Sequence, residues 1–216
     1  MPDLEMLLLR IPNLLVALTL HEFCHAYMAY RCGDPTPKFM GRLTLNPLSH
    51  LDPIGTICIL FAPIGWAKPV PVNPYNFRHP SRDDILVSLA GPFANLSIAI
   101  IIGSTLRVLT ITNIAIPIIA LKLLGLGVVM NIGLILFNLI PVYPLDGHHV
   151  LRELLPSYKA KEKYEAFNRI APFLLLAIIV FAPGLLWQVL APPISAAFWL
   201  FTGMNFDGFM RILYYL

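Results

Sequence analysis

The sequence predicts an all-α polytopic membrane protein, with four to six transmembrane helices and a small membrane-associated β hairpin or sheet between the first and second spans. Two observations support this fold class. The 216 residues are 57% hydrophobic and only 12% charged, with a mean hydropathy of +0.73, which is far from the composition of a soluble domain. The apolar residues also gather into segments that approach the ~20 residues required to cross a ~30 Å hydrocarbon core.

Four apolar segments qualify as membrane-spanning helices, and the fourth is interrupted by Pro183-Gly184. A fifth segment, residues 194–216, is ambiguous because it carries Asp207 and Arg211. It either spans the membrane or lies in the interface, with its aromatic side chains at the level of the headgroups. The four predicted spans cover about residues 7–30, 85–106, 121–141 and 170–190.

The segment between the first two spans, residues 31–84, is rich in proline and glycine. Within it, residues 41–45 and 66–73 are typical of short extended strands, and the prolines of the second suit an edge strand. The apolar stretch between them, residues 51–64, is too short to span and predicts a re-entrant or interfacial hairpin.

The whole chain, residues 1–216, is predicted to form a single domain. Its core comprises about residues 7–155, and its C-terminal helices comprise about residues 168–216.

Lysine and arginine concentrate in two loops, residues 31–84 and 152–169. The positive-inside rule therefore predicts that both loops lie in the cytoplasm, that the N-terminus lies outside, and that the first helix runs inward. The formal charge of +3 is too small to indicate a nucleic-acid partner. We expect a multi-pass protein of the cell membrane, surrounded by the lipid bilayer, whose active site faces the cytoplasmic side.

The pentad His21-Glu22-Phe23-Cys24-His25 lies inside the first predicted span. Residues four apart share one face of a helix, so both imidazoles can bind one metal ion while the glutamate reaches a metal-bound water. Ionisable residues at this depth in a membrane are costly and indicate a functional site. A chance occurrence of this short motif is disfavoured by its lipid-embedded context. The sequence therefore predicts one Zn²⁺ ion bound by His21 and His25.

A third protein ligand is expected, because catalytic zinc sites commonly use three such ligands and a water. Asp146 is the preferred candidate, since it follows the third span where prolines and a glycine break the helix, and a carboxylate at membrane depth needs a partner. One carboxylate and one hydroxide also neutralise zinc, which avoids burying net charge. His148 and His149 are rival ligands, although coordination by either would leave Asp146 unexplained.

Glu22 is then the expected general base, which accepts a proton from the zinc-activated water and passes it to the leaving amine. Asn95 and Asn138 could each bind a substrate carbonyl or the oxyanion, and interhelical hydrogen bonding is an equally good interpretation of each. Cys24 is conceivable as a ligand but is better interpreted as a packed thiol. His50 is more readily explained as an interfacial histidine than as a functional one.

Several motifs together resemble the site-2 protease family of intramembrane metalloproteases, the M50 peptidases, in a compact form without PDZ or CBS domains. They cover about residues 15–155 in the expected order. The second motif departs from the family pattern, because it reads Pro-Leu-Asp-Gly and is followed by two histidines where small residues are more usual. The matching stretches are the HExxH pentad, residues 41–47, 50–55 and 65–73, Gly91-Pro92-x-x-Asn95, and Asn138 to Gly147 followed by Leu151-Arg152.

The resemblance implies a zinc metalloendopeptidase that hydrolyses peptide bonds in or near transmembrane segments, with zinc held by His21, His25 and Asp146 and with Glu22 as base. The expected partners are transmembrane-protein substrates, such as anti-sigma factors or signal-peptide remnants. Because a substrate helix must unwind before cleavage, we expect β-addition to an edge strand of the enzyme to hold it. The residues of that substrate-binding strand are Lys68, Pro69, Val70, Pro71, Val72 and Asn73.

A function of another class remains the alternative: an inactive relative that binds membrane helices, or a membrane protein that handles zinc. The intact Glu22 disfavours both, because neither binding nor transport needs a base beside the metal.

Overall fold

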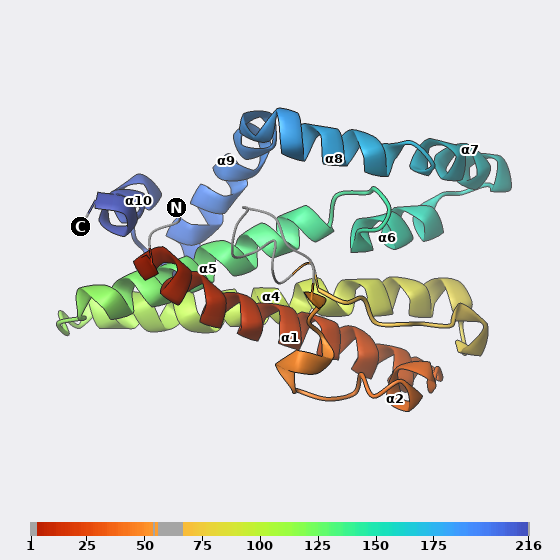
Figure 1. Ribbon diagram of the computed structural model, residues 1–216, viewed down its shortest axis with the longest axis horizontal. Helices are drawn as coiled ribbons and strands as arrows, with labels where there is room; N and C mark the ends of the chain where they lie inside the picture. The colour runs from red at the N-terminus through yellow and green to blue at the C-terminus, as the bar shows by residue number, and fades with distance from the viewer. Residues whose placement is uncertain (1–3, 54, 56–66, 216) are drawn as a thin grey trace.

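The computed structural model describes residues 4–53, 55 and 67–215, and these are mostly helical (Figure 1). Long apolar helices form nearly half of the chain, and a long connection that holds α2, η1 and η2 precedes α4. The elements are α1 (Leu4–Cys32), α2 (Thr36–Phe39), η1 (Pro47–Ser49), η2 (Pro74–Asn76), α4 (Pro80–Ile111), α5 (Ile118–Asn138), α6 (Asp146–Leu154), α7 (Tyr158–Asn168), α8 (Ala171–Phe181), α9 (Pro183–Thr202) and α10 (Phe206–Tyr215).

Four described helices, α1, α4, α5 and α9, are long and apolar enough to cross a membrane. A fifth span is possible by the same criteria if α7 and α8, which are bent by 41° at their junction, count as one. The prediction of a mostly helical protein is therefore confirmed, and the number of candidate spans agrees with the predicted four to six. The first three predicted spans lie largely within α1, α4 and α5, and α5 ends at Asn138, three residues early.

The fourth predicted span, residues 170–190, is wrong in its bounds. The chain breaks at Ala182, whose φ of −139° and ψ of 51° are not helical, and the spanning helix is α9. The cause is Pro183, since a proline disfavours helical geometry in the residue before it and is well placed at a helix start. The ambiguous segment 194–216 is divided between the end of α9 and the separate helix α10.

The predicted β hairpin or sheet is not supported: the described residues contain no sheet. Only an isolated antiparallel bridge joins Leu51 to Ala67, and residues 42–45 and 68–73 carry no ladder. Most of the predicted re-entrant stretch, and the start of the second predicted strand, lie outside the described residues.

Side chains replace a sheet in holding this connection. The buried Arg42 donates to the carbonyl oxygens of Ser49, Lys68 and Pro69. The buried Asp34 accepts from the N–H of Asn73 at 2.7 Å. Although burial opposes ionisation of Asp34, hydrogen bonds from Asn73, Thr36 and Asn76 lower the pKa of its carboxyl below the usual value.

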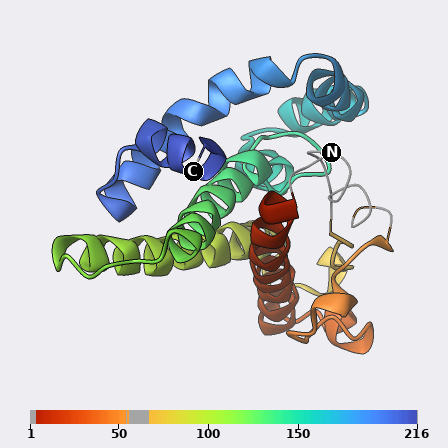
Figure 2. The ribbon, with the colours of Figure 1, turned by 60° about the vertical axis from the view of Figure 1, so that its left-hand side comes forward.

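The helical core is built on α1, α4 and α5, which pack on one another, while α9 and α10 pack at one end of α4 and α5 (Figure 2). At that end, Phe198 of α9 contacts Phe206 and Phe209, with ring centroids 5.6 and 5.0 Å apart. Glycines allow close approach, since a Cβ on Gly125 of α5 would overlap the Phe209 ring. The end of the bundle away from α6 and α7 is therefore tightly packed with apolar side chains.

Replacing Gly103 of α4 by alanine should destabilise the protein, because a Cβ there would lie 2.6 Å from Cβ of Phe201 on α9 and 3.3 Å from its carbonyl carbon. We expect a loss of about 1–3 kcal/mol in the free energy of unfolding, measured in detergent micelles. Gly133→Ala is the control, since nothing lies within 4 Å of a Cβ at that position of α5. Equal destabilisation by both substitutions would contradict this packing.

Candidate metal centre

The two histidines of the pentad lie on one buried face of α1, as their spacing predicts. His21 is 4% exposed and His25 is 8% exposed, and their Nε2 atoms are 3.0 Å apart. The rings meet edge to face, with centroids 4.6 Å apart. Both Nε2 atoms therefore point at the same small volume.

The carboxylate of Asp146 completes this cluster from the first turn of α6. Its Oδ2 lies 3.3 Å from His21 Nε2, and its Oδ1 lies 3.4 Å from His25 Nε2. Ligands at 2.0–2.1 Å from a tetrahedral zinc ion would be about 3.3–3.4 Å apart, so these three donors fit zinc. Among the described residues, this is the one group of three such side chains close enough to hold a metal ion.

The far nitrogen of each imidazole fixes which nitrogen carries the proton. His25 Nδ1 donates to the carbonyl of Val87 at 2.7 Å, and a carbonyl can only accept. His21 Nδ1 lies 2.6 Å from Asn95 Oδ1. In the neutral imidazoles each Nε2 therefore carries no proton and presents a lone pair, and the two lone pairs face each other and a carboxylate. Oδ2 of Asp146, buried without a hydrogen-bond partner among the described residues, points to the same requirement for a cation.

A chain of hydrogen bonds from Gly127 through Asn131, called the relay below, sets the orientation of the Asn95 amide. Asn131 of α5 donates from Nδ2 to the Gly127 carbonyl at 2.8 Å, which turns its oxygen toward Asn95 Nδ2 at 2.9 Å. Asn95 Nδ2 also donates to the Ala17 carbonyl at 3.3 Å. Its oxygen must then accept from His21, so two backbone carbonyls ultimately determine the tautomer of a candidate ligand.

The same face of α4 supplies the space for a metal ion. A Cβ on Gly91 would overlap His25 Nε2 and lie 2.6 Å from His21 Nε2, so only glycine fits there. Val87, Gly91 and Asn95 recur every four residues and all face α1. The helix thus orients both imidazoles and leaves the volume in front of them open.

Asp146 is positioned by a tight chain reversal after α5. A Cβ on Gly147 would overlap the Leu139 carbonyl oxygen, so the glycine lets the first turn of α6 fold against the end of α5. At the start of a helix, a carboxylate is also favoured by the helix dipole. The Asp-Gly pair therefore places a carboxylate opposite the imidazoles of α1.

The rival ligands lie elsewhere. The ring of His148 stacks on Tyr164, with centroids 5.2 Å apart, and His149 Nδ1 lies 3.3 Å from Asp84 Oδ2 of α4. Neither belongs to the ligand cluster. The Asp84–His149 pair instead ties α6 to α4 close to Asp146.

The other predicted site residues are distributed around the cluster. Glu22 is partly buried in the same turn as His21, and Cys24 is a partly buried free thiol. Asn138 donates to the Leu134 carbonyl of its own helix at 3.0 Å. His50 is buried in the connection before α4, 2.8 Å from the Thr44 carbonyl.

Asn95 uses its oxygen and its amide in contacts within the bundle, so the structure favours the interhelical interpretation of this residue over direct contact with substrate. The segment Lys68–Asn73 lies in the connection between α1 and α4 and is tied to it by Arg42 and Asp34.

Sequence reasoning missed Asn131 and Asp84. Both are buried polar residues in or beside an apolar run, which was an available signal. The contribution of the Val87 carbonyl could not be anticipated, because a backbone group leaves no mark in the sequence.

Comparison with known proteins places the chain among metalloproteases. The model of Peptidase family M50 matches residues 103–182, which include Asp146. Over 185 residues the chain is 42% identical to a protein of Bacillus subtilis named "Putative zinc metalloprotease YwhC", covering 82% of this chain and 84% of that protein.

More distant relatives agree. Over 188 residues the chain is 31% identical to the Rip2 protein of Mycolicibacterium smegmatis, which carries the same description, covering 82% of this chain and 68% of that protein. "Zinc metalloprotease MJ0392" of Methanocaldococcus jannaschii is 27% identical over 175 residues, which are 80% of this chain and 42% of that protein. No solved structure matches the chain.

Replacing Asn95 by alanine should weaken zinc binding, because His21 would lose the acceptor that fixes its tautomer and ring orientation. Loss of such a partner typically lowers metal affinity 10–100-fold, which competition with a chromophoric chelator measures. Asn138→Ala is the matched control, since that amide bonds only within its own helix among the described residues. Equal affinities of the two variants would disprove the relay.

Proposed function

The chain belongs to peptidase family M50 and is a zinc metalloprotease with several membrane-spanning helices, and from this premise we propose that it is an intramembrane endopeptidase. In this proposal it hydrolyses peptide bonds in or near transmembrane segments of other proteins. A single zinc ion is bound by His21, His25 and Asp146, and Glu22 is the general base.

The observation that supports this proposal best is the place of the ligand cluster. Its three side chains converge in the interior of a bundle whose helices α1, α4 and α5 are all candidate spans. His25 lies seven residues before the end of α1, which is about 10 Å along the helix. A peptide bond cleaved at such a position would itself lie within or at the edge of the membrane.

When bound, zinc polarises a carbonyl and lowers the pKa of a coordinated water toward ~7. The residues of the chain supply the remaining steps. Glu22, adjacent to His21 and only partly buried, takes a proton from the attacking water and delivers it to the nitrogen of the leaving amine. Asn138 has one amide hydrogen beyond its bond to Leu134, and we assign to it the substrate carbonyl.

Substrate binding is assigned to the segment Lys68–Asn73, which joins no sheet in the described residues. Prolines at positions 69 and 71 fix their own φ and favour extended geometry in the residues before them. Among the described residues, none accepts a hydrogen bond from the N–H of Val70 or Val72. Two such donors, two residues apart, could pair with the backbone of an unwound substrate.

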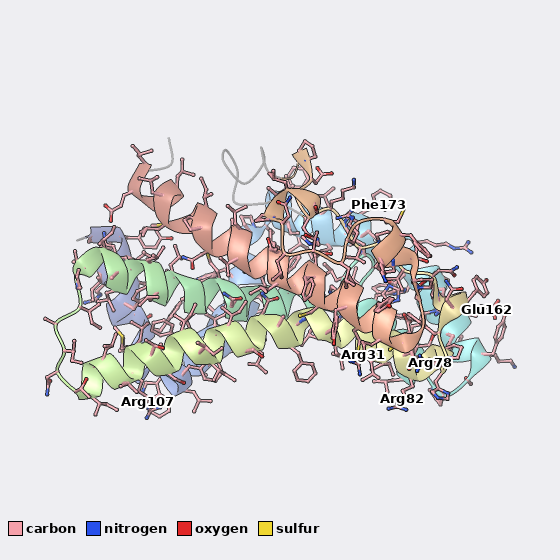
Figure 3. All side chains as sticks on the ribbon, turned by 90° about the horizontal axis from the view of Figure 1, so that it is seen from below. Arg31, Arg78, Arg82, Arg107, Glu162 and Phe173 are labelled. Atoms are coloured by element: carbon pink, nitrogen blue, oxygen red, sulfur yellow. The ribbon has the colours of Figure 1, made fainter. Side chains whose placement is uncertain are left out.

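The distribution of positive charge supports a cytoplasmic site. Arg31, Arg78 and Arg82 lie together at the end of the bundle that carries α2, α6 and α7, and Arg107 lies at the opposite end (Figure 3). The positive-inside rule assigns the richer end to the cytoplasm. The ligand cluster is in the half of α1 nearest that end, which gives water the shorter route.

The proposed substrates are single-pass membrane proteins, such as anti-sigma factors or remnants of signal peptides. The alternative of a membrane protein that only binds helices or handles zinc leaves Glu22 without a role.

Glu22→Gln should abolish cleavage and keep zinc. Loss of a general base lowers turnover typically 10²–10⁴-fold, whereas the three ligands are untouched. The measurement is cleavage of a panel of membrane-reconstituted helices, with zinc content determined on the same preparation. Cys24→Ser, in the same turn but outside the cluster, should retain both properties. Unchanged cleavage after the Glu22→Gln substitution would rule out the peptidase mechanism and favour the alternative class.

Substituting Val70 and Val72 together by proline should reduce cleavage while zinc content stays normal, because both backbone donors are removed at a distance from the ligands. The double alanine variant is the control: it loses the same valine side chains and keeps both N–H groups. If proline and alanine variants cleave equally well, this segment does not bind substrate through its backbone.

A further inference from the structure

A cavity of about 480 Å³ opens where α1 ends and α4 begins, and its lining includes none of the three residues of the metal cluster. Its lining combines two kinds of side chain. Tyr27, Met28 and Leu86 give it an apolar wall, and three arginines with one histidine give it a positive one. The polar part of the lining comprises Arg31, Arg78, His79, Arg82 and Asp83, beside Cys32.

The structure holds two of these arginines in place. Arg31 donates to the Tyr27 hydroxyl at 3.1 Å, with its guanidinium 5.8 Å from the centre of that ring. The backbone N–H of Arg78 donates to the Cys32 carbonyl at 3.1 Å, which pins it to the end of α1. Gly33, with φ of +113°, lets the chain at Asn76 and Arg78 cross this closely. Contacts within the protein therefore position the Arg31 guanidinium and the backbone of Arg78.

The positive charge of this cavity is not neutralised from within. In the part of the chain that the structure describes, none of Arg31, Arg78 and Arg82 forms an ion pair with a carboxylate. The one acidic residue of the lining, Asp83, accepts from the backbone N–H of His79 at 2.8 Å. Three exposed arginines that line one cavity favour an anion with several acceptor oxygens.

A second cavity at the same end of the bundle shows the contrast. Two of its three basic residues are paired with acids: Arg152 Nε lies 2.7 Å from Glu165 Oε1, and Lys161 Nζ lies 2.8 Å from Glu153 Oε2. The third, Arg169, forms no ion pair with a described residue. The contacts of the first two tie α7 to α6, so the two cavities differ in how many of their basic residues are paired.

We propose that the cavity formed by Arg31, Arg78 and Arg82 binds the phosphate of an anionic phospholipid headgroup, with the first carbons of an acyl chain against Tyr27, Met28 and Leu86. The cavity lies at the ends of two candidate spans, where headgroups are found, and its lining is both cationic and apolar. An acidic peptide would use the charge but not the apolar wall. The bound lipid would brace α1 against α4, the two helices that carry and orient the zinc-binding imidazoles.

The test measures thermal unfolding of the full-length, zinc-loaded protein in detergent during titration with phosphatidylglycerol. Wild type should be stabilised by phosphatidylglycerol, and neither phosphatidylcholine nor inorganic phosphate should match it. In the variant Arg78→Gln with Arg82→Gln, the lipid concentration for half of the effect should rise about thirtyfold, since each basic group near an anionic lipid contributes about a factor of five. Arg82→Gln alone, which breaks no hydrogen bond given by the described residues, should show about fivefold.

The matched control is Lys159→Gln with Lys163→Gln, which removes the same charge from exposed positions on α7 and should stay within about twofold of wild type. A thirtyfold rise of the half-effect lipid concentration in this control would mean that overall charge, and not this cavity, attracts the lipid, and it would overturn the proposed site. Equal stabilisation by phosphatidylcholine, by inorganic phosphate or by an acidic peptide would overturn the lipid assignment. The readout involves no cleavage, so its failure would leave the proposed protease function untouched.

Discussion

The structure depends on the electrostatic interaction of three metal-ligand candidates inside an apolar bundle. Two imidazole lone pairs and a carboxylate, all largely buried, converge to within about hydrogen-bonding distance of one another. Three electron-rich groups without a shared proton repel one another at such separations in a low-dielectric interior, and a divalent cation turns that repulsion into attraction. The carbonyls of Val87, Gly127 and Ala17 act, directly or through Asn131 and Asn95, to keep a proton on each Nδ1, so that each Nε2 of the neutral imidazoles is free to bind a cation.

The need to hold that arrangement explains the sequence of α4. Asp84, Val87, Gly91 and Asn95 lie on one face of the helix, and each meets a different requirement: a partner for His149 on α6, an acceptor for His25, empty space, and an acceptor for His21. The helix therefore acts as a template between α1 and α6. Gly91 matters here because it has no side chain, which leaves room for an ion beside the two imidazoles.

The sequence predicted the helical membrane fold, because hydrophobic composition and segment length are set by the bilayer itself. It also identified the three side chains that the structure brings together, since buried ionisable groups in apolar runs need partners. It failed where local chemistry decides. Pro183 moved a span that hydropathy alone placed too early, and side-chain contacts from Arg42 and Asp34 fixed the connection before α4 without a sheet. The hydrogen bonds that set the tautomer of His21 could not be predicted from the sequence, because two of their acceptors are backbone carbonyls.

The apolar end and the polar end of the bundle contribute to stability in different ways, because a metal ion can stabilise only a site that has already formed. A ligand that binds only the folded arrangement stabilises it, but the site must exist before the ion arrives. The packed end, with Phe198 against Phe206 and Phe209 and with Phe209 against Gly125 of α5, can form without any ion and can hold α4 and α5 in register. The polar end can then tolerate unpaired lone pairs in the absence of metal. A metal ion held as we propose would link His21 of α1 to Asp146 of α6, two residues far apart in the sequence, and would therefore add stability at the polar end of the bundle.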